Sequence, residues 1–572
     1  MGINKKDVIR LMEKIAIYLE LQGENPFKIS AYRKAAQALE RDDRSLDDIY
    51  DFTKIKGIGK GTNAVIQEYI QTGESQTLSE LEKQVPNSLI PLLELPGLGG
   101  KKLAKLYQEL GVTDAETLKH ACQQGKVEEL PGFGKKTVEN ILAALKEAGK
   151  RPARLPIAMM LPIAERLESY LKKIKEIDRF SRAGSLRRMQ ETIKDLDFII
   201  TTDEPEAVCD ALLSIENSKE VIAKGETKVS IVIEDVYDIN VDFRIVRKEE
   251  FATTLHHFTG SKEHNVAMRQ LAKAQGEKIN EYGVENEETG EVITFMTEEE
   301  FFNHFDLHYI PPEVRENTGE TEIFKEPYRL VEFQDIKGDL HMHTTWSDGA
   351  QSLEEMVVQA RNKSYDFIAI TDHSKFLRVA NGLNETRLRK QCEEIANLNK
   401  KYPDIHIFTG VEMDILPDGK LDFSDAFLKE LDFVIASIHS SFNQTEEQIM
   451  YRLETALENP YVSLIAHPTG RLIGRRPGYQ INVDKLIEKA KATNTALEIN
   501  ANPNRLDLSY EWAKKAQAAG VTLAINTDAH NYQMLEHMKY GIGIARKGWI
   551  KKETVMNTWS VQALKDYFNR NK

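Results

Sequence analysis

The chain has few cysteines and no long apolar run, and both absences limit what it can be. Its three cysteines, Cys122, Cys209 and Cys392, lie far apart, so the sequence predicts neither a disulfide framework nor a cysteine-based zinc site. No stretch of about 18 consecutive apolar residues occurs, which excludes a membrane-spanning helix. The first residues are charged and do not form an apolar signal segment. We therefore expect a cytoplasmic protein that does not bind a membrane.

Length and charge distribution indicate several domains with different partners. At 572 residues the chain exceeds the ~250–300 residues at which a single core stops growing. Its net charge of −14 disfavours a nucleic-acid partner, but the distribution of charge does not. Residues 1–200 carry 33 Lys and Arg against 29 Asp and Glu, whereas residues 201–350 carry 14 against 33. The excess acid lies in one middle block, so the first block can still attract phosphate.

A glycine hairpin recurs three times in residues 1–150, each time before a helix-like run. Glycine lets the backbone approach a phosphate, and the N–H groups that open the next helix bind phosphate without reading sequence. One isolated copy is more often an ordinary turn or helix cap, but three copies in one chain, together with the carboxylates Asp195 and Asp197 and the turn Gly184–Arg188, favour binding to the DNA backbone. The glycine pairs are Gly57 with Gly59, Gly97 with Gly99, and Gly132 with Gly134.

The rest of the chain divides into an α+β part and a barrel. Alternating apolar runs at Leu196–Thr201, Lys228–Glu234 and Ile239–Val246 predict a sheet within residues 152–310. From residue 335 onward apolar strands alternate with helices, which predicts a parallel (β/α)7 barrel. Its expected strands are Ile336–His341, Phe367–Thr371, His406–Glu412, Phe433–His439, Val462–His467, Ala496–Asn500 and Thr522–Asp528.

Six of these seven strands end in residue types that bind metals. Barrel active sites form where the strands end, so the side chains should converge. Imidazole and carboxylate ligands without thiolate suit Mn²⁺, Zn²⁺ or Fe²⁺ and can activate water in phosphate-ester hydrolysis. Any one of these histidines alone is more often an ordinary buried residue, but nine ligands at strand ends favour two or three ions. The nine are His341, His343, Asp348, His373, Glu412, His439, His467, Asp528 and His530.

A second candidate centre consists of carboxylates in the predicted sheet. Asp195 and Asp197 are two residues apart on one strand and point to the same face, and Asp242 would add a third carboxylate from a neighbouring strand. Three carboxylates can hold two Mg²⁺ ions for in-line phosphoryl transfer, although an acidic pair alone is more often a solvated face. Upstream, the turn Gly184–Arg188 offers the Ser185 hydroxyl and guanidinium groups suited to a triphosphate.

Two sets of motifs resemble known families. The segments His341–Gly349, Thr371–Ser374, Gly410–Glu412, Ser437–His439, Ala466–Pro468 and Asn526–His530 resemble the PHP (polymerase and histidinol phosphatase) phosphoesterase domain. The segments Gly184–Arg188, Asp195–Asp197, Lys224–Lys228, His257–Asn265 and Ile279–Tyr282 resemble family X DNA polymerases of the polymerase beta type. The whole chain is similar to the bacterial members of that family that carry a C-terminal PHP domain.

The resemblance implies roles for particular residues. Asp195, Asp197 and Asp242 would bind two catalytic Mg²⁺ or Mn²⁺ ions, and the barrel would hold two or three Mn²⁺ or Zn²⁺ ions with Glu412 as the bridging ligand. Lys28 and Tyr32 would hold a 5′ phosphate of DNA, while Val65 stands where the family keeps its Schiff-base lysine. The nucleotide contacts would be Gly184, Ser185, Arg188, Arg154, His257, Phe258, Gly260 and Asn265.

We therefore expect a multidomain, monomeric, template-directed DNA polymerase of repair type that acts on gapped or primer-template DNA with dNTPs. The resemblance implies that it fills short gaps in base excision repair and carries a 3′–5′ exonuclease in the barrel. Cleavage at abasic sites stays open. One rival is a histidinol-phosphate-type phosphatase with a vestigial polymerase half, and another is a non-catalytic DNA-binding scaffold. The expected parts are a small helical DNA-binding domain (1–85), fingers (86–151), a nucleotidyltransferase palm (152–246), a thumb (247–312), a linker (313–334) and the PHP domain (335–572).

Overall fold

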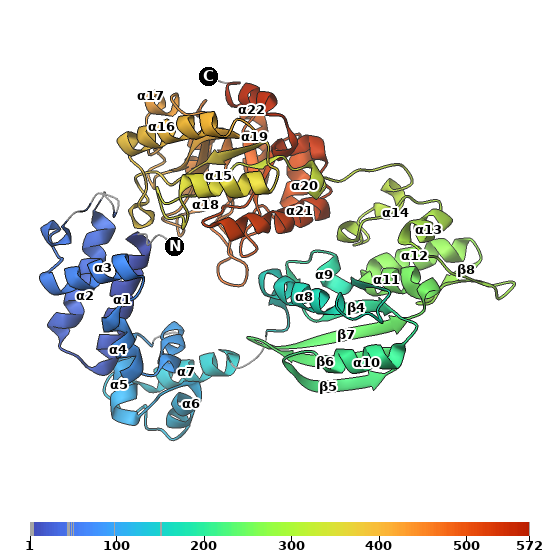
Figure 1. Cartoon of the computed structure of the whole chain (residues 1–572), viewed down its shortest axis with the longest axis horizontal. Helices are drawn as coiled ribbons and strands as arrows, with labels where there is room; N and C mark the ends of the chain where they lie inside the picture. The colour runs from blue at the N-terminus through green and yellow to red at the C-terminus, as the bar shows by residue number, and fades with distance from the viewer. Residues whose placement is uncertain are drawn as a thin grey trace. The chain divides into compact units, whose positions relative to one another are not determined.

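The structure is a computed structural model that describes residues 5–42, 46, 49, 51–95, 98–148 and 152–570. The chain divides into two compact units, and the helices of residues 5–148 belong to a different unit from the sheets of residues 152–342 and 401–572 (Figure 1). Within the described ranges, no helix is long and apolar enough to cross a membrane.

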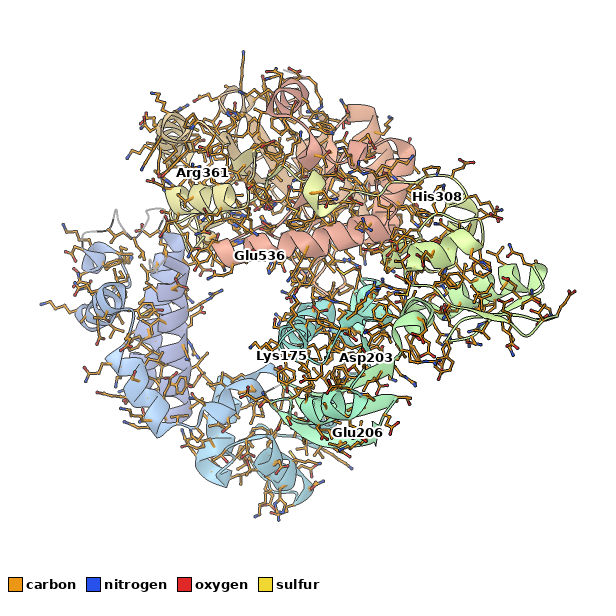
Figure 2. The ribbon with its side chains drawn as sticks, turned by 45° about the vertical axis from the view of Figure 1, so that its right-hand side comes forward. Lys175, Asp203, Glu206, His308, Arg361 and Glu536 are labelled. Carbon is orange, nitrogen blue, oxygen red and sulfur yellow. The ribbon has the colours of Figure 1, made fainter. Side chains whose placement is uncertain are left out.

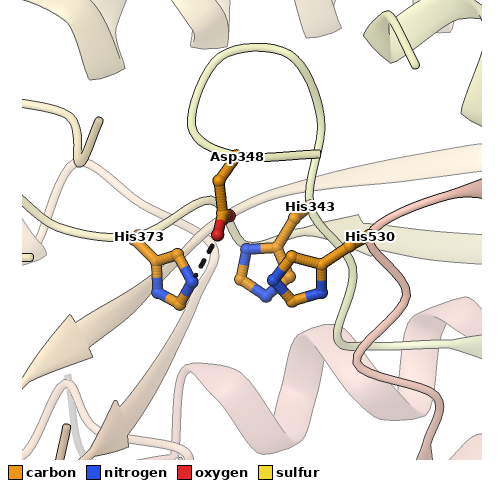
Figure 3. A group of neighbouring side chains, drawn as sticks. All are labelled: His343, Asp348, His373 and His530. Carbon is orange, nitrogen blue, oxygen red and sulfur yellow. Dashed lines mark ion pairs between the residues drawn. The ribbon is translucent and has the colours of Figure 1, made fainter. Parts of the chain in front are cut away.

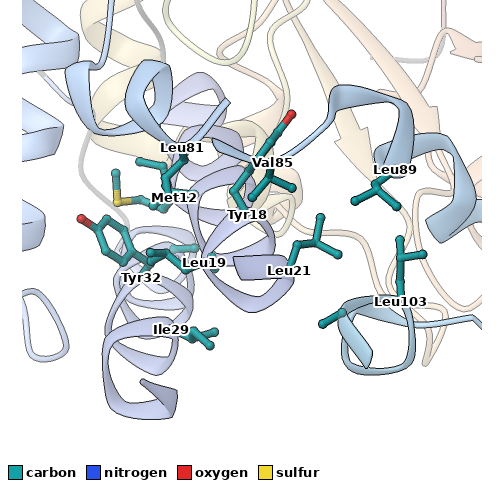
Figure 4. Packing of buried hydrophobic residues seen from close by; sticks show 14 of the residues in the cluster. Met12, Tyr18, Leu19, Leu21, Ile29, Tyr32, Leu81, Val85, Leu89 and Leu103 are labelled. Carbon is teal, nitrogen blue, oxygen red and sulfur yellow. The ribbon is translucent and has the colours of Figure 1, made fainter. Parts of the chain in front are cut away.

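Residues 5–148 are helical and share one apolar core. Helix α1 contributes Met12 and Leu19 to this core, α2 contributes Ile29, and α5 contributes Leu103 (Figure 4). The amphipathic pattern of each helix is thus satisfied by its neighbours. The helices are α1 (Lys5–Gln22), α2 (Pro26–Arg41), α3 (Lys60–Thr72), α4 (Gln76–Gln84), α5 (Gly100–Leu110), α6 (Ala115–Gln123) and α7 (Lys135–Ala148), with 3-10 turns at Phe52–Lys54 and Asn87–Glu94.

The sheet predicted for the palm has five strands in the order β2-β4-β7-β6-β5. Strands β4 and β7 are parallel, and the other pairs are antiparallel. The strands are β2 (Arg179–Arg182), β4 (Leu196–Thr201), β5 (Ser218–Gly225), β6 (Lys228–Glu234) and β7 (Asp238–Val246), next to the short pair β1 (Leu155–Pro156) and β3 (Thr192–Ile193) and helices α8 (Ile157–Leu171), α9 (Gly184–Arg187) and α10 (Pro205–Leu213). Asp203, labelled in Figure 2, precedes α10. Its carboxylate lies 2.8 Å from the ammonium of Lys248.

The thumb follows as α11 (Phe251–Thr259), α12 (Lys262–Ala274), the strands β8 (Glu277–Ile279), β9 (Val284–Asn286) and β10 (Val292–Ile293), and α13 (Glu298–His304). The next segment, expected to be a linker, is packed. It forms the turn Pro312–Val314 and the short helix α14 (Glu320–Ile323), and it buries Arg315, Phe324 and Leu330. The sequence did not predict this packing for two reasons. The segment is acidic, and its buried residues are not spaced with the period of a helix or a strand.

The C-terminal part is a nearly closed barrel of seven parallel strands in chain order, as predicted. The first and last strands meet where the backbone N–H of Leu340 donates to Oδ1 of Asn526 at 3.1 Å. The strands are β11 (Gly338–Asp339), β12 (Phe367–Ile370), β13 (His406–Asp414), β14 (Phe433–Ser437), β15 (Leu464–Ile465), β16 (Ala496–Asn500) and β17 (Leu523–Asn526).

Helices connect the barrel strands. Near the end of α15, Arg361 donates to Asp404 at 2.8 Å, just before β13 (Figure 2). The connecting helices are α15 (Leu353–Asn362), α16 (Glu385–Lys401), α17 (Asp425–Leu428), α18 (Glu446–Glu458), α19 (Val483–Thr493) and α20 (Tyr510–Ala519), and the last strand is followed by α21 (Met538–Lys547) and α22 (Val561–Phe568).

Two candidate active centres

The barrel brings its predicted ligands together at the carboxyl ends of the strands. Figure 3 shows one group, in which Asp348 points from its loop toward His373, at 3.5 Å, while His343 and His530 lie beside them. Two further groups share members with the first, so the three form one centre. In every group the ligand atoms lie within 4.8 Å of one another; the further groups are His341 with His343, Glu412 and Asp528, and His373 with Glu412 and His439.

Glu412 is buried at the middle of this centre. Its Oε1 lies 2.9 Å from Nε2 of His467 and 3.2 Å from Nε2 of His439. Its Oε2 lies 3.3 Å from Nε2 of His341. Each carboxylate oxygen therefore faces histidine nitrogens on a different side, which is the arrangement that a carboxylate bridging two cations requires.

The donor set fits divalent cations on chemical grounds. It combines imidazole nitrogens with carboxylate oxygens and has no thiolate. Burial alone would lower the pKa of His439, but Glu412 and Asp414 raise it to about 10. The pKa of His341 is likewise raised by Glu498, Glu412 and Asp528 against the effect of burial. The carboxylates thus attract positive charge, and a divalent cation can replace these protons.

Sequence reasoning missed a second set of carboxylates that orient the histidines. Glu498 lies in β16, the one strand without a predicted ligand; its Oε1 is 2.8 Å from Nδ1 of His341 and its Oε2 accepts from the backbone N–H of His467 at 2.8 Å. Asp414 Oδ1 is 3.2 Å from Nδ1 of His439. Such contacts turn Nε2 toward a metal. The available signals were a glutamate inside an apolar strand and a carboxylate two residues after Glu412, on the same face.

The palm places its carboxylates on adjacent strands. Asp197 in β4 lies directly opposite Asp242 in β7, and Asp195 immediately precedes β4. Gly184 lies against this face with φ of 63°, and a β-carbon on it would come 2.3 Å from Oδ2 of Asp197. Only glycine allows the turn to approach the carboxylate this closely.

Two of the palm carboxylates already have cationic neighbours. The Lys228 ammonium lies 3.0 Å from Oδ2 of Asp242, and the Lys194 ammonium lies 3.3 Å from Oδ2 of Asp195. The three aspartates are not among the groups with ligand atoms within 4.8 Å in the described part of the chain. The structure therefore gathers them on one face without drawing their oxygens together. Burial, followed by repulsion from Asp195 and Asp242, raises the pKa of Asp197 to about 6.

This raised pKa predicts that Asp197→Asn stabilises the metal-free protein. Because the folded state holds the Asp197 proton more tightly than the unfolded chain, ionisation destabilises the fold, and the full penalty is present only above the folded pKa of about 6. The free energy of unfolding should rise by on the order of 2 kcal/mol at about pH 8, and by less at about pH 5. Denaturant unfolding with a chelator measures the gain. Asp203→Asn, at an exposed carboxylate, is the matched control, and an equal gain for both would contradict the pKa argument.

The turn after β2 meets the thumb at the predicted nucleotide residues. Arg188 donates from Nη1 to the carbonyl of Thr259 and from Nε to Oε1 of Glu316 at 3.1 Å. A β-carbon on Gly260, which ends α11, would lie 3.3 Å from Nη1 of Arg188. Ser185 lies in α9, within the same turn as Gly184. The structure therefore joins the palm turn Gly184–Arg188 to the end of α11.

The remaining predicted nucleotide residues lie on α11 and α12, with one exception. The Asn265 amide donates to the carbonyl of His257 at 2.8 Å. The Phe258 ring lies 4.6 Å below the guanidinium of Arg244. Arg154 instead donates to the Thr192 hydroxyl of β3 at 3.1 Å, so the structure gives it a partner outside this group.

The glycine hairpins precede helices as the sequence predicts. Gly59 and Gly99 cap α3 and α5, and Gly134 directly precedes α7. A β-carbon at any of the three would meet no described atom within 4 Å, so these helix starts are open. Gly57 and Gly132 have φ of 117° and 98°, where glycine is favoured.

The other residues predicted to contact DNA differ in their exposure to solvent. Lys28 is exposed and lies 2.8 Å from Glu24. Tyr32 is buried in the helical core, which gives it a packing role (Figure 4). Val65 is also buried. Gly97 lies outside the described residues.

The hairpins predict DNA binding that does not depend on sequence. Gly99→Glu or Gly134→Glu places a carboxylate at an open helix start without a steric clash and should weaken duplex binding roughly tenfold for unrelated sequences, with a smaller dependence on salt. Fluorescence anisotropy over a salt series measures this. Ala115→Glu adds the same charge at the start of α6, where no glycine hairpin stands. A loss confined to one DNA sequence, or an equal loss for the control, would contradict the assignment.

Four segments of the chain match known domain families. A helix-hairpin-helix domain matches residues 3–75, and a SAM-like helix-hairpin-helix tandem matches residues 89–147. The DNA polymerase beta thumb matches residues 254–316, and the PHP domain matches residues 339–502. These matches fall on the helical repeats, the thumb and the barrel.

One similar protein matches the full chain, and others match only a part of it. The chain is 59% identical over 569 residues, with 100% of both chains covered, to the Bacillus subtilis (strain 168) protein named DNA polymerase/3′-5′ exonuclease PolX. A probable phosphatase of Thermoanaerobacter sp. (strain X514) is 29% identical over 245 residues, which are 41% of this chain and 95% of that protein. A probable phosphatase of Caldicellulosiruptor bescii is 31% identical over 209 residues, or 34% of this chain and 80% of that protein. Of these three likenesses, the first spans both candidate centres, and the other two cover the barrel part alone.

Proposed function

The chain belongs to the family X DNA polymerases that carry a C-terminal PHP domain, and from this premise we propose that it fills short gaps in DNA and trims 3′ ends through a separate centre in the barrel. The observation that carries the proposal is the presence of two distinct ligand sets in one chain. The palm set consists of Asp195, Asp197 and Asp242, and the barrel set surrounds Glu412.

The palm carboxylates support polymerase chemistry. Asp195, Asp197 and Asp242 would hold two Mg²⁺ or Mn²⁺ ions, which in such sites neutralise charge that develops during phosphoryl transfer. Burial of Asp197, together with repulsion from Asp195 and Asp242, outweighs the attraction of nearby cations and raises its pKa, a cost to the fold that a structural role does not explain. We propose that Ser185 and Arg188, in the turn beside Asp197, bind the triphosphate. The end of α11 and the Asn265 amide would hold the sugar and base.

The barrel ligands support hydrolysis of DNA ends. The nine predicted residues would hold two or three Mn²⁺ or Zn²⁺ ions, and such ions supply an activated water for attack on a phosphodiester. Glu412 would lie between two ions, while Glu498 and Asp414 hold His341 and His439 in the tautomer that presents Nε2. Glu498 and Asp414 would therefore act by positioning the histidine ligands.

The rival functions explain less of the chain. A histidinol-phosphate-type phosphatase would need only the barrel, and the probable phosphatases cover 41% and 34% of this chain. Such a protein has no need for a carboxylate with a raised pKa at Asp197. A non-catalytic DNA-binding scaffold would need neither ligand set. The side chain of Val65 in α3 has no amine, so a lyase reaction through a Schiff base at this position is not part of the proposal.

Template-directed incorporation tests the polymerase part of this proposal. Duplexes with a one-nucleotide gap and each of the four template bases are supplied with one dNTP at a time. We expect extension only by the complementary nucleotide, because a repair polymerase must read the template. Extension without regard to template would favour a terminal transferase, and no extension would contradict the proposal.

A further inference from the structure

The barrel reaches the predicted nucleotide subsite of the palm through one buried lysine. Lys547 is the last residue of α21 and is 2% exposed. Its ammonium lies 2.7 Å from Oε1 of Glu316 and 3.4 Å from the carbonyl oxygen of Arg188. Palm, thumb and the barrel strands belong to one compact unit, so this contact lies within that unit.

Glu316 connects the lysine to Arg188. The same Oε1 that accepts from Lys547 accepts from Nε of Arg188 at 3.1 Å and from the Gln190 amide at 2.6 Å. Nη1 of Arg188 donates to the carbonyl of Thr259. Among the described residues, Nη2 of Arg188 has no hydrogen-bond partner. The guanidinium of Arg188 is thus held through Nε and Nη1, while Nη2 can still donate to an anion. A planar guanidinium held in this way is suited to bind phosphate oxygens.

Packing around this lysine reinforces the connection. Gly543 in α21 faces Met189, the residue after Arg188, and a β-carbon on Gly543 would come 2.3 Å from Cε of Met189. Other barrel cations pair with palm and thumb carboxylates, as Lys539 does with Glu165 at 2.6 Å and Arg546 with Glu313 at 2.8 Å. The side chains of Lys539 and Arg546 are partly exposed, whereas that of Lys547 is buried and contacts Arg188.

We propose that Lys547 of the PHP domain is a positioning residue for the polymerase reaction: through Glu316 it holds Arg188 in the orientation that binds the nucleotide triphosphate. A carboxylate beside Arg188 would otherwise compete with the triphosphate for the guanidinium. The ammonium of Lys547 forms an ion pair with Glu316, which partly neutralises this carboxylate and fixes its position. The inference rests on the proposed role of Arg188 in gap filling.

A kinetic comparison tests the inference in the full chain. Lys547→Met keeps the length of the side chain and removes its charge, and it should raise KM for the dNTP in gap filling roughly tenfold, the effect of a lost alignment of one charged hydrogen bond. The value of kcat at saturating dNTP should stay within about twofold, because bound nucleotide realigns Arg188. General destabilisation would instead lower the active fraction and leave KM unchanged. Trimming of 3′ ends, which uses other residues, should persist.

Two further variants keep the test decisive. Lys539→Met removes a cation from the same helix and should leave KM unchanged. Glu316→Gln should raise KM, and its combination with Lys547→Met should cost less than the product of the two single effects, because both act through Arg188. An unchanged KM for Lys547→Met, or an equal rise for Lys539→Met, would overturn the inference. If Arg188→Gln itself left KM unchanged, the proposed role of Arg188 would be wrong instead.

Discussion

Asp197→Asn is expected to reduce gap filling by on the order of 10²–10³-fold or more, since the change removes a charged ligand from the group that holds the catalytic ions. Asp197 lies opposite Asp242 and beside Gly184, so no other described carboxylate can take its place without moving a strand. Single-turnover incorporation into gapped DNA measures the loss. The same variant should be more stable than the wild type without metal, so loss of folding cannot explain it.

Trimming by the barrel is the internal control for this loss. Because the ligands around Glu412 lie on other strands, Asp197→Asn should leave the rate of 3′–5′ trimming unchanged. Asp203→Asn, an exposed carboxylate next to the same sheet, should leave both activities unchanged. Near-normal incorporation by Asp197→Asn would show that the palm motif has been misassigned.

Glu412→Gln is expected to abolish trimming while gap filling continues. The amide has nearly the same shape as the carboxylate, but it offers one oxygen and no charge to a centre where His341, His439 and His467 surround both oxygens. Losing such a ligand costs on the order of 10²–10³-fold. Shortening of 5′-labelled DNA measures trimming, and Mn²⁺ should support it better than Mg²⁺ because imidazole-rich sites favour the softer ion.

A matched surface variant separates this effect from a general change in the barrel. Glu447→Gln in α18 makes the same chemical change at an exposed position and should trim normally. Hydrolysis of histidinol phosphate, measured beside trimming, tests the phosphatase rival. If Glu412→Gln trimmed normally, or if the metal-loaded wild type hydrolysed only histidinol phosphate, the nuclease assignment would fail.

Much of this architecture follows from patterns that the sequence carries locally. The run Leu196–Thr201 is apolar and bounded by polar residues, and it forms β4 with the predicted bounds. The barrel was predictable because its strands repeat with regular helices between them, and because ligand residue types stand at the strand ends. The glycine hairpins were predictable for a similar reason, since open helix starts depend on nearby residues.

Contacts between distant segments could not be predicted in this way. Glu498 belongs to the metal centre only because β16 lies between β15 and β17, and its buried partner His341 is 157 residues away. The contact of Lys547 with Glu316 depends on how α21 packs against the palm. Arg154 matched a family position, yet the structure pairs it with Thr192 through β1 and β3. The burial of Tyr32 could not be predicted either, because it depends on how all the helices of this core pack together.

The central claim, that one chain carries two separate DNA-processing centres, is tested most directly by a single labelled substrate. A gapped duplex with a 5′-labelled primer is incubated with the wild-type protein and Mn²⁺, with and without dNTPs, and the primer length is followed with time. We expect the primer to lengthen to the end of the gap when dNTPs are present and to shorten from its 3′ end when they are absent. A primer that lengthens but never shortens, or one that shortens under both conditions without any extension, would contradict it.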